Sequence, residues 1–404
     1  MVIGTGDNRL AHCVAAATIL LMAIGTVFVF SAGANLSHHF DLHRFYEFPG
    51  LRQILFFPVA CVVMYTISRF NYRRLGFAEG WWKSPIGYLL VFSLALLVLV
   101  LIPQFGTEIN RARRWLRIPA GPIVVSFQPS ELAKWSTLLF LAAACSHFGA
   151  DIRSYWKRFV PLCCVIGAIV GLIIVEDFGT AAFVALLGFL MLIMAGARLW
   201  HLLTPLPFVA VGFFLALARS PGRLQRLAAF LRPDSWADSA AYQANQSLIA
   251  IGSGRLWGKG LGRGICKYGH LPEDTTDFVF AIIGEELGFV GTAAVIGLFI
   301  AFVCLGIVVV VRCRDPFGRL LAAGIVLAIS IQAAINIGVV TVVLPTKGIP
   351  LPFVSAGGTS MLLSSAAVGV LLNVARQSAP TKTADESAPA LILDQSDTKV
   401  PATV

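Results

Sequence analysis

The sequence predicts an all-α polytopic membrane protein of about ten transmembrane helices, with a long extracytoplasmic loop between the seventh and the eighth. Composition is the first observation: 57% of the 404 residues are hydrophobic and only 13% are charged. Soluble globular domains carry about 45–50% apolar and about 25% charged residues. The mean hydropathy of +0.80 is the second observation. Lipid rather than water therefore surrounds most of this chain.

Ten apolar runs, the third observation, define the expected helices. Most are close to the length of about 20 residues that crosses a hydrocarbon core. The runs cover residues 11–31, 54–68, 88–103, 132–147, 159–175, 178–195, 202–217, 288–311, 320–343 and 361–374. The second run is short, which leaves a re-entrant segment open as an alternative. Pro205 and Pro207 must kink or start the seventh helix, because proline donates no helical hydrogen bond.

Lys and Arg orient these helices, because basic residues stay in short cytoplasmic loops. Basic residues follow the second, fourth, sixth and eighth helices, all on one side of the membrane. They are Arg69, Arg73, Arg74, Lys83, Arg153, Lys157, Arg158, Arg198, Arg312, Arg314 and Arg319. Ten crossings then place both termini in the cytoplasm. The first apolar run has no small-residue cleavage site, so we expect a retained helix.

Two outward loops break the charge pattern. Four arginines cluster between the third and fourth helices, on the side that is usually poor in basic residues. They are Arg111, Arg113, Arg114 and Arg117. The loop over residues 219–277 is by far the longest, and loops of this length are usually functional or disordered; its second half has enough apolar side chains to pack. We expect a membrane domain over 1–376 and a disordered cytoplasmic tail over 377–404.

Composition and motifs exclude several classes of function. The formal net charge of +10 is spread over both membrane faces without a nucleic-acid motif, which argues against a nucleic-acid partner. The eight cysteines have neither disulfide nor metal spacing. The chain has no Walker loop, dinucleotide fingerprint or nucleophile elbow. On the inside the charge suits anionic lipid headgroups, and on the outside the arginine cluster suits a phosphorylated ligand.

A lysine predicted to lie within the membrane follows the arginine cluster. In the stretch FQPSELAK, Ser130 suits a helix N-cap and Glu131 suits the first turn, which puts Lys134 about one turn inside. A charge at the bilayer centre costs roughly 2.5–3.5 kcal/mol, so a lysine facing lipid is disfavoured. The functional interpretation is a contact to substrate or the lining of a cavity. The alternative is a lysine that snorkels to the outer headgroups with Glu131 as its partner.

Two further stretches carry candidate chemistry. Asp277 ends the long loop and is followed at once by apolar residues. Partial desolvation there raises the pKa of a carboxylate and makes it a candidate general base, with helix N-capping as the alternative. Between the ninth and tenth helices, three prolines and three glycines break the backbone near the outer face, which requires protein or a watery cavity around it. Lys347 lies within that break and has few structural explanations.

Together these stretches resemble the SEDS family, the polymerases represented by FtsW, RodA and SpoVE. The resemblance is carried by ARRWLR with FQPSELAK, EDFGTA, YQANQSLIAIGSG with GKGLG, LPEDTTDFVFAIIGEELG and LPTKGIPLPFVSAGGTS. These motifs stand in family order between Arg111 and Ser360, and the ten-helix layout covers nearly the whole chain. The PTKG stretch and the loop ending KYGHLPE are closer to the FtsW division branch than to RodA.

The resemblance implies a peptidoglycan glycosyltransferase that polymerises lipid II at the outer face of the bacterial cytoplasmic membrane, in cell division. It also implies a class B penicillin-binding protein as partner, with other proteins of a division or elongation complex. Asp277 matches the family's essential carboxylate. The candidate substrate-binding residues are Arg111, Arg113, Arg114, Trp115, Glu131, Lys134, Lys347 and Ser355.

The expected chemistry agrees with these residue types. In lipid II polymerisation a sugar hydroxyl attacks an anomeric carbon as undecaprenyl pyrophosphate leaves, which needs a base and cationic stabilisation of the leaving group. Neither nucleotide nor haem is required, and no ligand cluster identifies a metal site, although a divalent cation that screens the pyrophosphate stays open. Three residues depart from the family pattern: Glu176, where proline is usual, Thr275, where histidine is common, and Ala356, where tyrosine is usual.

Two other functions stay open from the sequence. A lipid-linked precursor flippase or another transporter would use the same cations and cavity without needing Asp277 as a base. A non-catalytic division scaffold would agree with the departures at Thr275 and Ala356.

Overall fold

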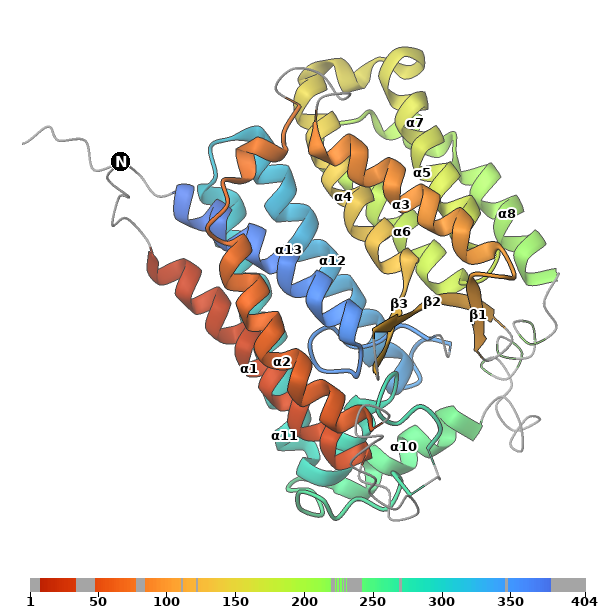
Figure 1. Cartoon of the computed structure of the whole chain (residues 1–404), viewed down its shortest axis with the longest axis vertical. Coiled ribbons are helices and arrows are strands. Elements are labelled where there is room, and N and C mark those ends of the chain that lie inside the picture. Colours follow the sequence, from red (N-terminus) through yellow and green to blue (C-terminus); the bar gives the residue numbers. More distant parts are fainter. Residues whose placement is uncertain are drawn as a thin grey trace, which may run out of the picture.

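The computed structural model describes residues 8–33, 48–77, 84–109, 112–120, 123–218, 242–268, 271–345 and 348–378, together with alternate residues between 222 and 230. Long helices run alongside one another through the molecule, and the three strands and α10 lie toward one end of them (Figure 1). The predicted tail lies outside the described residues from position 379 onward.

The helices follow the apolar runs and begin at residues that favour a helix start. Proline occupies the first turn of α2, α3, α4 and α12, and the side chains of Ser84, Asp177 and Asp315 cap α3, α6 and α12. The bounds are α1 (Asn8–Gly33), α2 (Pro49–Ile67), η2 (Tyr72–Leu75), α3 (Pro85–Leu101), α4 (Pro129–Phe148), η4 (Gly149–Arg153), η5 (Tyr155–Phe159), α5 (Val160–Ile173), α6 (Phe178–Met194), α7 (Leu199–Leu203), α8 (Leu206–Ala218), α10 (Tyr242–Gly254), α11 (Val279–Arg312), α12 (Pro316–Val340) and α13 (Gly358–Gln377).

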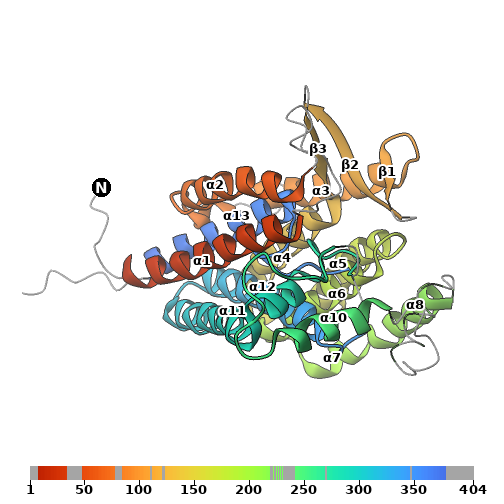
Figure 2. The ribbon, with the colours of Figure 1, turned by 90° about the horizontal axis from the view of Figure 1, so that it is seen from below.

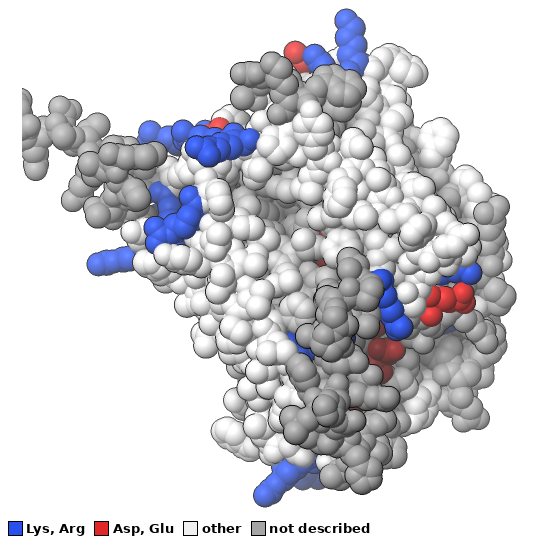
Figure 3. Space-filling view, viewed as in Figure 1, with Lys and Arg blue, Asp and Glu red and all other residues white. Residues whose placement is uncertain are grey.

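Apolar helices make this a multi-pass membrane protein. Seven helical stretches among the described residues are long and apolar enough to cross a membrane: 8–33, 49–67, 155–173, 199–218, 279–312, 316–340 and 358–377. The shorter apolar helices α3 and α6, and the more polar α4, cover the three other expected runs. On the visible face, charged side chains lie at the top and upper left and again at the right and in the lower half, with a mostly uncharged band between these two sets (Figure 3). The count of ten crossings stays a prediction.

The central helix is α12, which packs against α4, α6, α11 and α13. On one side of it α1 packs against α2, α11 and α13, and on the other α3, α5 and α6 pack around α4 (Figure 2). Small residues allow the closest contacts. A Cβ on Gly25 of α1 would lie 2.5 Å from backbone atoms of Val354, so the segment before α13 passes directly against α1.

The all-α prediction is wrong for residues 106–127, which form an antiparallel sheet of β1 (Gly106–Ile109), β2 (Ala112–Ala120) and β3 (Ile123–Phe127), with β2 in the middle. The register pairs Trp115 with Thr107 and Arg113 with Glu108, so Arg114 is the extra residue of a β-bulge. The many arginines of β2 obscure the alternation of apolar and polar residues that is typical of a strand. The β-branched residues of β3, by contrast, favour a strand.

One helix begins earlier than its apolar run, and one expected break is confirmed. α11 begins at Val279, well before the expected start at Gly288, and Gly288 instead marks a break inside the helix, with φ of +66°. A positive φ at this point favours glycine. The expected effect of Pro205 is confirmed, because α7 ends at Leu203 and α8 begins at Leu206.

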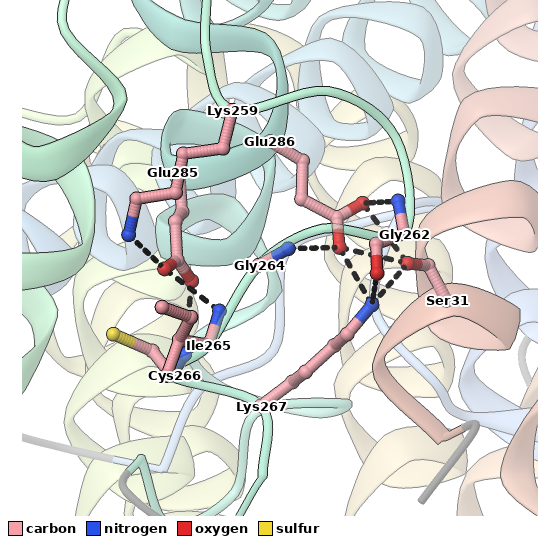
Figure 4. A network of polar contacts seen from close by, with 9 residues as sticks. All are labelled: Ser31, Lys259, Gly262, Gly264, Ile265, Cys266, Lys267, Glu285 and Glu286. Atoms are coloured by element: carbon pink, nitrogen blue, oxygen red, sulfur yellow. Dashed lines mark hydrogen bonds and ion pairs between the residues drawn. The ribbon is translucent and has the colours of Figure 1, made fainter.

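Two adjacent glutamates of α11 fasten the 258–267 segment of the long loop (Figure 4). Glu286 is fully buried and accepts from Lys267 Nζ at 2.8 Å, from Ser31 Oγ at 2.9 Å and from the backbone N–H groups of two loop glycines. Glu285, also fully buried, accepts from Lys259 Nζ at 2.6 Å and from two further loop N–H groups. Paired charges therefore join the loop to α11, and the hydroxyl of Ser31 joins α1 to the same cluster.

We predict that Glu286→Gln destabilises the protein by about 3–5 kcal/mol, because it leaves the buried Lys267 without its counter-ion. The matched control is Glu108→Gln, since the Glu108–Arg113 pair is largely exposed at a distance of 3.5 Å and such pairs contribute about 0–1 kcal/mol. Thermal unfolding of the purified protein in detergent measures both. Equal shifts in Tm for the two variants would contradict a structural role of the buried pair.

Candidate active site

Asp277 lies in the turn that leads into α11. Its N–H donates to the Glu273 carbonyl at 3.1 Å, and its own carbonyl accepts from Asn336 Nδ2 of α12 at 2.8 Å. The N-cap position of α11 is occupied by Phe278, so the alternative of Asp277 as a helix N-cap is wrong. These two hydrogen bonds hold the backbone of Asp277 and do not involve its carboxylate.

Burial is the main cause that raises the pKa of Asp277 to about 7, and the negative charges of Glu273 and Asp177 contribute to this rise. The positive charges of Arg114 and Arg226 act in the opposite direction. A carboxylate with a pKa near neutrality can both take up and release a proton at physiological pH, which is the property required of a general base. Groups from the loop, β2 and the cap of α6 contribute to this electrostatic setting.

The segment before α13 forms the opposite wall of the site. A Cβ on Gly348 would lie 3.2 Å from Asp277 Oδ2, so a glycine leaves room for the carboxylate at this point. The N–H of Ala356 donates to the Thr275 carbonyl at 2.9 Å. The two residues that depart from the family pattern at this site therefore meet through their backbones.

Ser355 holds a turn within this same segment. Its buried Oγ accepts from the N–H of Leu351 at 2.8 Å. The hydroxyl can also donate, so a structural bond does not use all of its capacity. Lys347, the candidate cation of this segment, lies outside the described residues.

The bulge in β2 directs Arg114 toward the loop between α5 and α6. Its Nε and Nη2 both donate to the backbone carbonyl of Glu176, at 3.0 and 2.8 Å, and Nη1 lies 3.9 Å from Asp177 Oδ2. Asp177 is buried and caps α6 through the N–H and hydroxyl of Thr180. The forked guanidinium is thereby fixed in orientation.

A second contact fastens the sheet to the same loop. The N–H of Arg113 donates to Glu176 Oε2 at 2.8 Å, and the Arg113 guanidinium pairs with Glu108 at 3.5 Å. Arg113, Arg114 and Trp115 all keep part of their side chains exposed. The strand β2 therefore carries two partly exposed arginines that are fastened to the loop of Asp177, together with a partly exposed indole, and Arg111 lies outside the described residues.

Lys134 is buried in α4, with 1% of its side chain exposed, so the alternative of a lysine that snorkels to the headgroups is wrong. Its Nζ donates to Glu131 Oε2 at 2.7 Å, as the spacing of three residues indicates, and to Gln332 Oε1 at 3.0 Å. Glu131 also accepts from the hydroxyl of Ser360 at 3.1 Å. The pair links α4 to α12 and α13 through hydrogen bonds in the interior.

Sequence reasoning missed Gln332 and Asn336, both buried on α12. They are polar residues within the expected ninth run, whose mainly apolar composition indicates only a membrane helix. The signal that could have found them is their spacing, because polar residues at i and i+4 on a membrane helix share one face and need partners there.

A metal centre has little support from the described residues, among which three or more His, Cys, Asp or Glu side chains do not gather in a group that could hold an ion. The cations that the site offers are instead arginine and lysine side chains, which suit a phosphorylated ligand.

Comparisons with known proteins agree on one family. The model of the family described as cell cycle protein, with FtsW, RodA and SpoVE as its members, matches residues 11–380. The chain is 36% identical over 365 residues to the probable peptidoglycan glycosyltransferase FtsW of Coxiella burnetii, covering 89% of this chain and 95% of that protein. It is 39% identical over 366 residues to the stage V sporulation protein E of Bacillus subtilis, with the same coverage.

Two solved structures are similar over nearly the whole chain. One, from work on the structural coordination of polymerization and crosslinking by a peptidoglycan synthase complex, has a TM-score of 0.70 at 27% identity and covers 93% of this chain and 98% of that chain. The other is the rod shape determining protein RodA of Thermus thermophilus, with a TM-score of 0.63 at 28% identity, covering 92% of this chain and 97% of that chain.

We predict that Arg114→Lys loosens the sheet, because lysine cannot make the two forked bonds to the Glu176 carbonyl. Loss of one charge-assisted bond of about 1.5–3 kcal/mol should speed local amide exchange in β2 by roughly 10-fold to 100-fold. Hydrogen–deuterium exchange read by mass spectrometry measures this. Arg117→Lys, an exposed change on the same strand, is the control, and equal exchange in both variants would refute the anchoring role.

Proposed function

Because the chain belongs to the FtsW, RodA and SpoVE family of cell cycle proteins, we infer that it is a peptidoglycan glycosyltransferase that polymerises lipid II into glycan strands. The relatives named FtsW favour a role in cell division. The observation that carries the chemistry is Asp277, a partly buried carboxylate that lies just before α11 and has a pKa raised to about 7.

Asp277 acts as the general base in the proposed mechanism. A sugar hydroxyl of one substrate gives its proton to the Asp277 carboxylate while its oxygen bonds to the anomeric carbon of the other. The bond from that carbon to undecaprenyl pyrophosphate breaks, and the electron pair leaves on the pyrophosphate. Holding base and hydroxyl in one geometry supplies much of the rate enhancement.

Cations near Asp277 stabilise the leaving group. Arg113 and Arg114 are partly exposed on β2. Because Nε and Nη2 of Arg114 already donate to the Glu176 carbonyl, in this proposal Arg114 contacts a phosphate through its remaining N–H groups. Arg111 and Lys347 complete the proposed set on sequence grounds. Lys134 is already paired with Glu131, so in this proposal it binds substrate only where a phosphate replaces part of that pairing.

Trp115 and Ser355 complete the proposed substrate contacts. Trp115 follows the two arginines in the sequence of β2, and its indole offers an apolar face with a polar N–H, which suits a sugar ring. Ser355 supports the segment that faces Asp277 and offers a hydroxyl donor.

The proposed topology has ten crossings, with both termini in the cytoplasm and the sheet, the 258–267 segment and Asp277 on the outer face of the bacterial cytoplasmic membrane. The basic loops that orient the helices support it. On that face the lipid tail of the substrate stays in the bilayer while its sugars reach the site. A class B penicillin-binding protein is the proposed partner, which the similarity to a chain from work on a peptidoglycan synthase complex supports.

We predict that Asp277→Asn lowers lipid II polymerisation by roughly 10²-fold to 10⁴-fold, because the amide cannot accept the proton. The assay follows glycan formed from labelled lipid II by the purified chain with its class B partner. Asp274→Asn is the matched control, since burial also raises the pKa of Asp274, to about 6, and it lies three residues upstream. This control should polymerise near the wild-type rate.

Two results would count against the proposal in different ways. Full activity of Asp277→Asn would contradict the role of Asp277 as general base, but not the glycosyltransferase function. No glycan from the wild type, with an independent polymerase active in the same assay, would overturn the glycosyltransferase function itself.

The rate should rise with pH through a midpoint near 7, because the base works in its deprotonated form and its pKa is raised to about 7. Glu273→Gln should move this midpoint to lower pH, since the negative charge of Glu273 raises the pKa of Asp277. A pH–rate profile of kcat/KM measures both. A wild-type midpoint at the ordinary carboxylate value of 3.8 would contradict the assignment.

A further inference from the structure

Two amide side chains on α12 face the site from the centre of the molecule. Gln332 and Asn336 are one helical turn apart, so they share a face of the helix. Both are almost fully buried, with 4% and 1% of each residue exposed. A buried amide needs hydrogen-bond partners. The partners that these two find lie on other elements, and Asn336 Oδ1 is buried without one among the described residues.

Asn336 ties two backbone segments together beside the candidate base. Its Nδ2 donates to the carbonyl of Asp277 at 2.8 Å and to the carbonyl of Ile349 at 2.8 Å. Because both partners are acceptors, only the amino end of the amide can face them. One side chain therefore fixes the turn that carries Asp277 against the segment that passes its carboxylate.

Gln332 makes the neighbouring link. Its Nε2 donates to the carbonyl of Pro350 at 2.9 Å, and its Oε1 accepts from Lys134 Nζ at 3.0 Å. The consecutive carbonyls of Ile349 and Pro350 are thus both bound by α12. The two amides connect Asp277 at one end to the Lys134–Glu131 pair at the other.

We propose that Asn336 and Gln332 are positioning residues for glycosyl transfer, which hold the backbone of Asp277 and the 349–350 segment in fixed register with the buried Lys134–Glu131 pair. The inference rests on the proposed role of Asp277 as base. Neither amide touches the reacting atoms in this account. They act by keeping the carboxylate where a bound hydroxyl can reach it.

A purely structural role is the competing explanation. Prolines at 345, 350 and 352 prevent regular hydrogen bonding in this segment, and carbonyls freed near the membrane interior need donors. Under that explanation the amides contribute only stability. Under the proposal they also set the position and solvent access of Asp277.

Asn373 of α13 provides a matched control. It is buried, its Nδ2 donates to the Ser68 carbonyl at 2.9 Å, and its Oδ1 accepts from the N–H of Tyr72 at 3.0 Å. Asn336→Leu and Asn373→Leu therefore each release two backbone groups. Both should lower Tm, and only Asn336→Leu should change catalysis.

The experiment measures lipid II polymerisation by the full chain with its class B partner, for wild type, Asp277→Asn, Asn336→Leu, Asn373→Leu and Gln332→Met. Asn336→Leu should lower kcat by about 10²-fold, the scale of a misplacement of about 1 Å, with KM for lipid II little changed. Gln332→Met should lose less, because it releases Pro350 and not Asp277. It also serves as the test if Asn336→Leu does not fold.

The pH profile separates positioning from stability. Among the described residues, the charged groups that act on Asp277 are Glu273 from its own turn, Asp177 at the cap of α6, Arg114 from β2, and Arg226. Release of the turn admits water, so Asn336→Leu should move the acidic limb of kcat/KM to lower pH, while Asn373→Leu should leave it in place.

The outcomes distinguish the two proposals. If Asp277→Asn is inactive while Asn336→Leu and Gln332→Met keep the kcat and acidic limb of Asn373→Leu, the positioning role is wrong. If Asp277→Asn is fully active, the assignment of the base fails first, and this inference fails with it. A loss of kcat with a shifted limb in Asn336→Leu that is absent from Asn373→Leu supports the positioning role.

Discussion

A charge that is removed from water must be paired, and the arrangement of this protein depends on how that constraint is met. Lys134 pairs with Glu131 in the interior and adds Gln332 of α12. Lys267 pairs with Glu286 and adds Ser31 of α1. In both cases the second partner lies on a helix distant in sequence. The pairing that each charge requires therefore also fixes which helices meet and in what register.

Asp277 is a partly buried charge whose pairing is less complete. Burial and two nearby carboxylates raise its pKa to about 7, against the attraction of Arg114 and Arg226. Arg114 is held by the Glu176 carbonyl and lies 3.9 Å from Asp177. The polar groups around Asp277 fix its backbone rather than lowering its pKa to the ordinary range. A rigid turn with a weakly acidic carboxylate is the combination that general base catalysis requires.

Features that depend on interactions between residues close in the sequence could be predicted from the sequence. The apolar runs gave the helices and Pro205 gave a break, because both depend on neighbouring residues. Lys134 shows the limit: its partner three residues away follows from helical spacing, while its contact to Gln332, 198 residues away, does not. Asn336 was missed for the same reason, since its partner Asp277 is 59 residues distant. The sheet was missed because the arginines of β2 find partners only in the folded protein.

The departures from the family pattern are compatible with a working site for a physical reason. Thr275 and Ala356 meet through a carbonyl and an N–H, which every non-proline residue supplies, so their side chains can change without loss of that bond. Glu176 differs, because its carboxylate accepts from the N–H of Arg113, a contact that a proline side chain cannot make. In this chain the Glu176 carboxylate thus adds a contact between the sheet and the loop before α6 to the two bonds that Arg114 makes with the Glu176 carbonyl. The two features that favoured a non-catalytic scaffold, Thr275 and Ala356, therefore lose their force, since neither side chain takes part in the backbone bond that joins them.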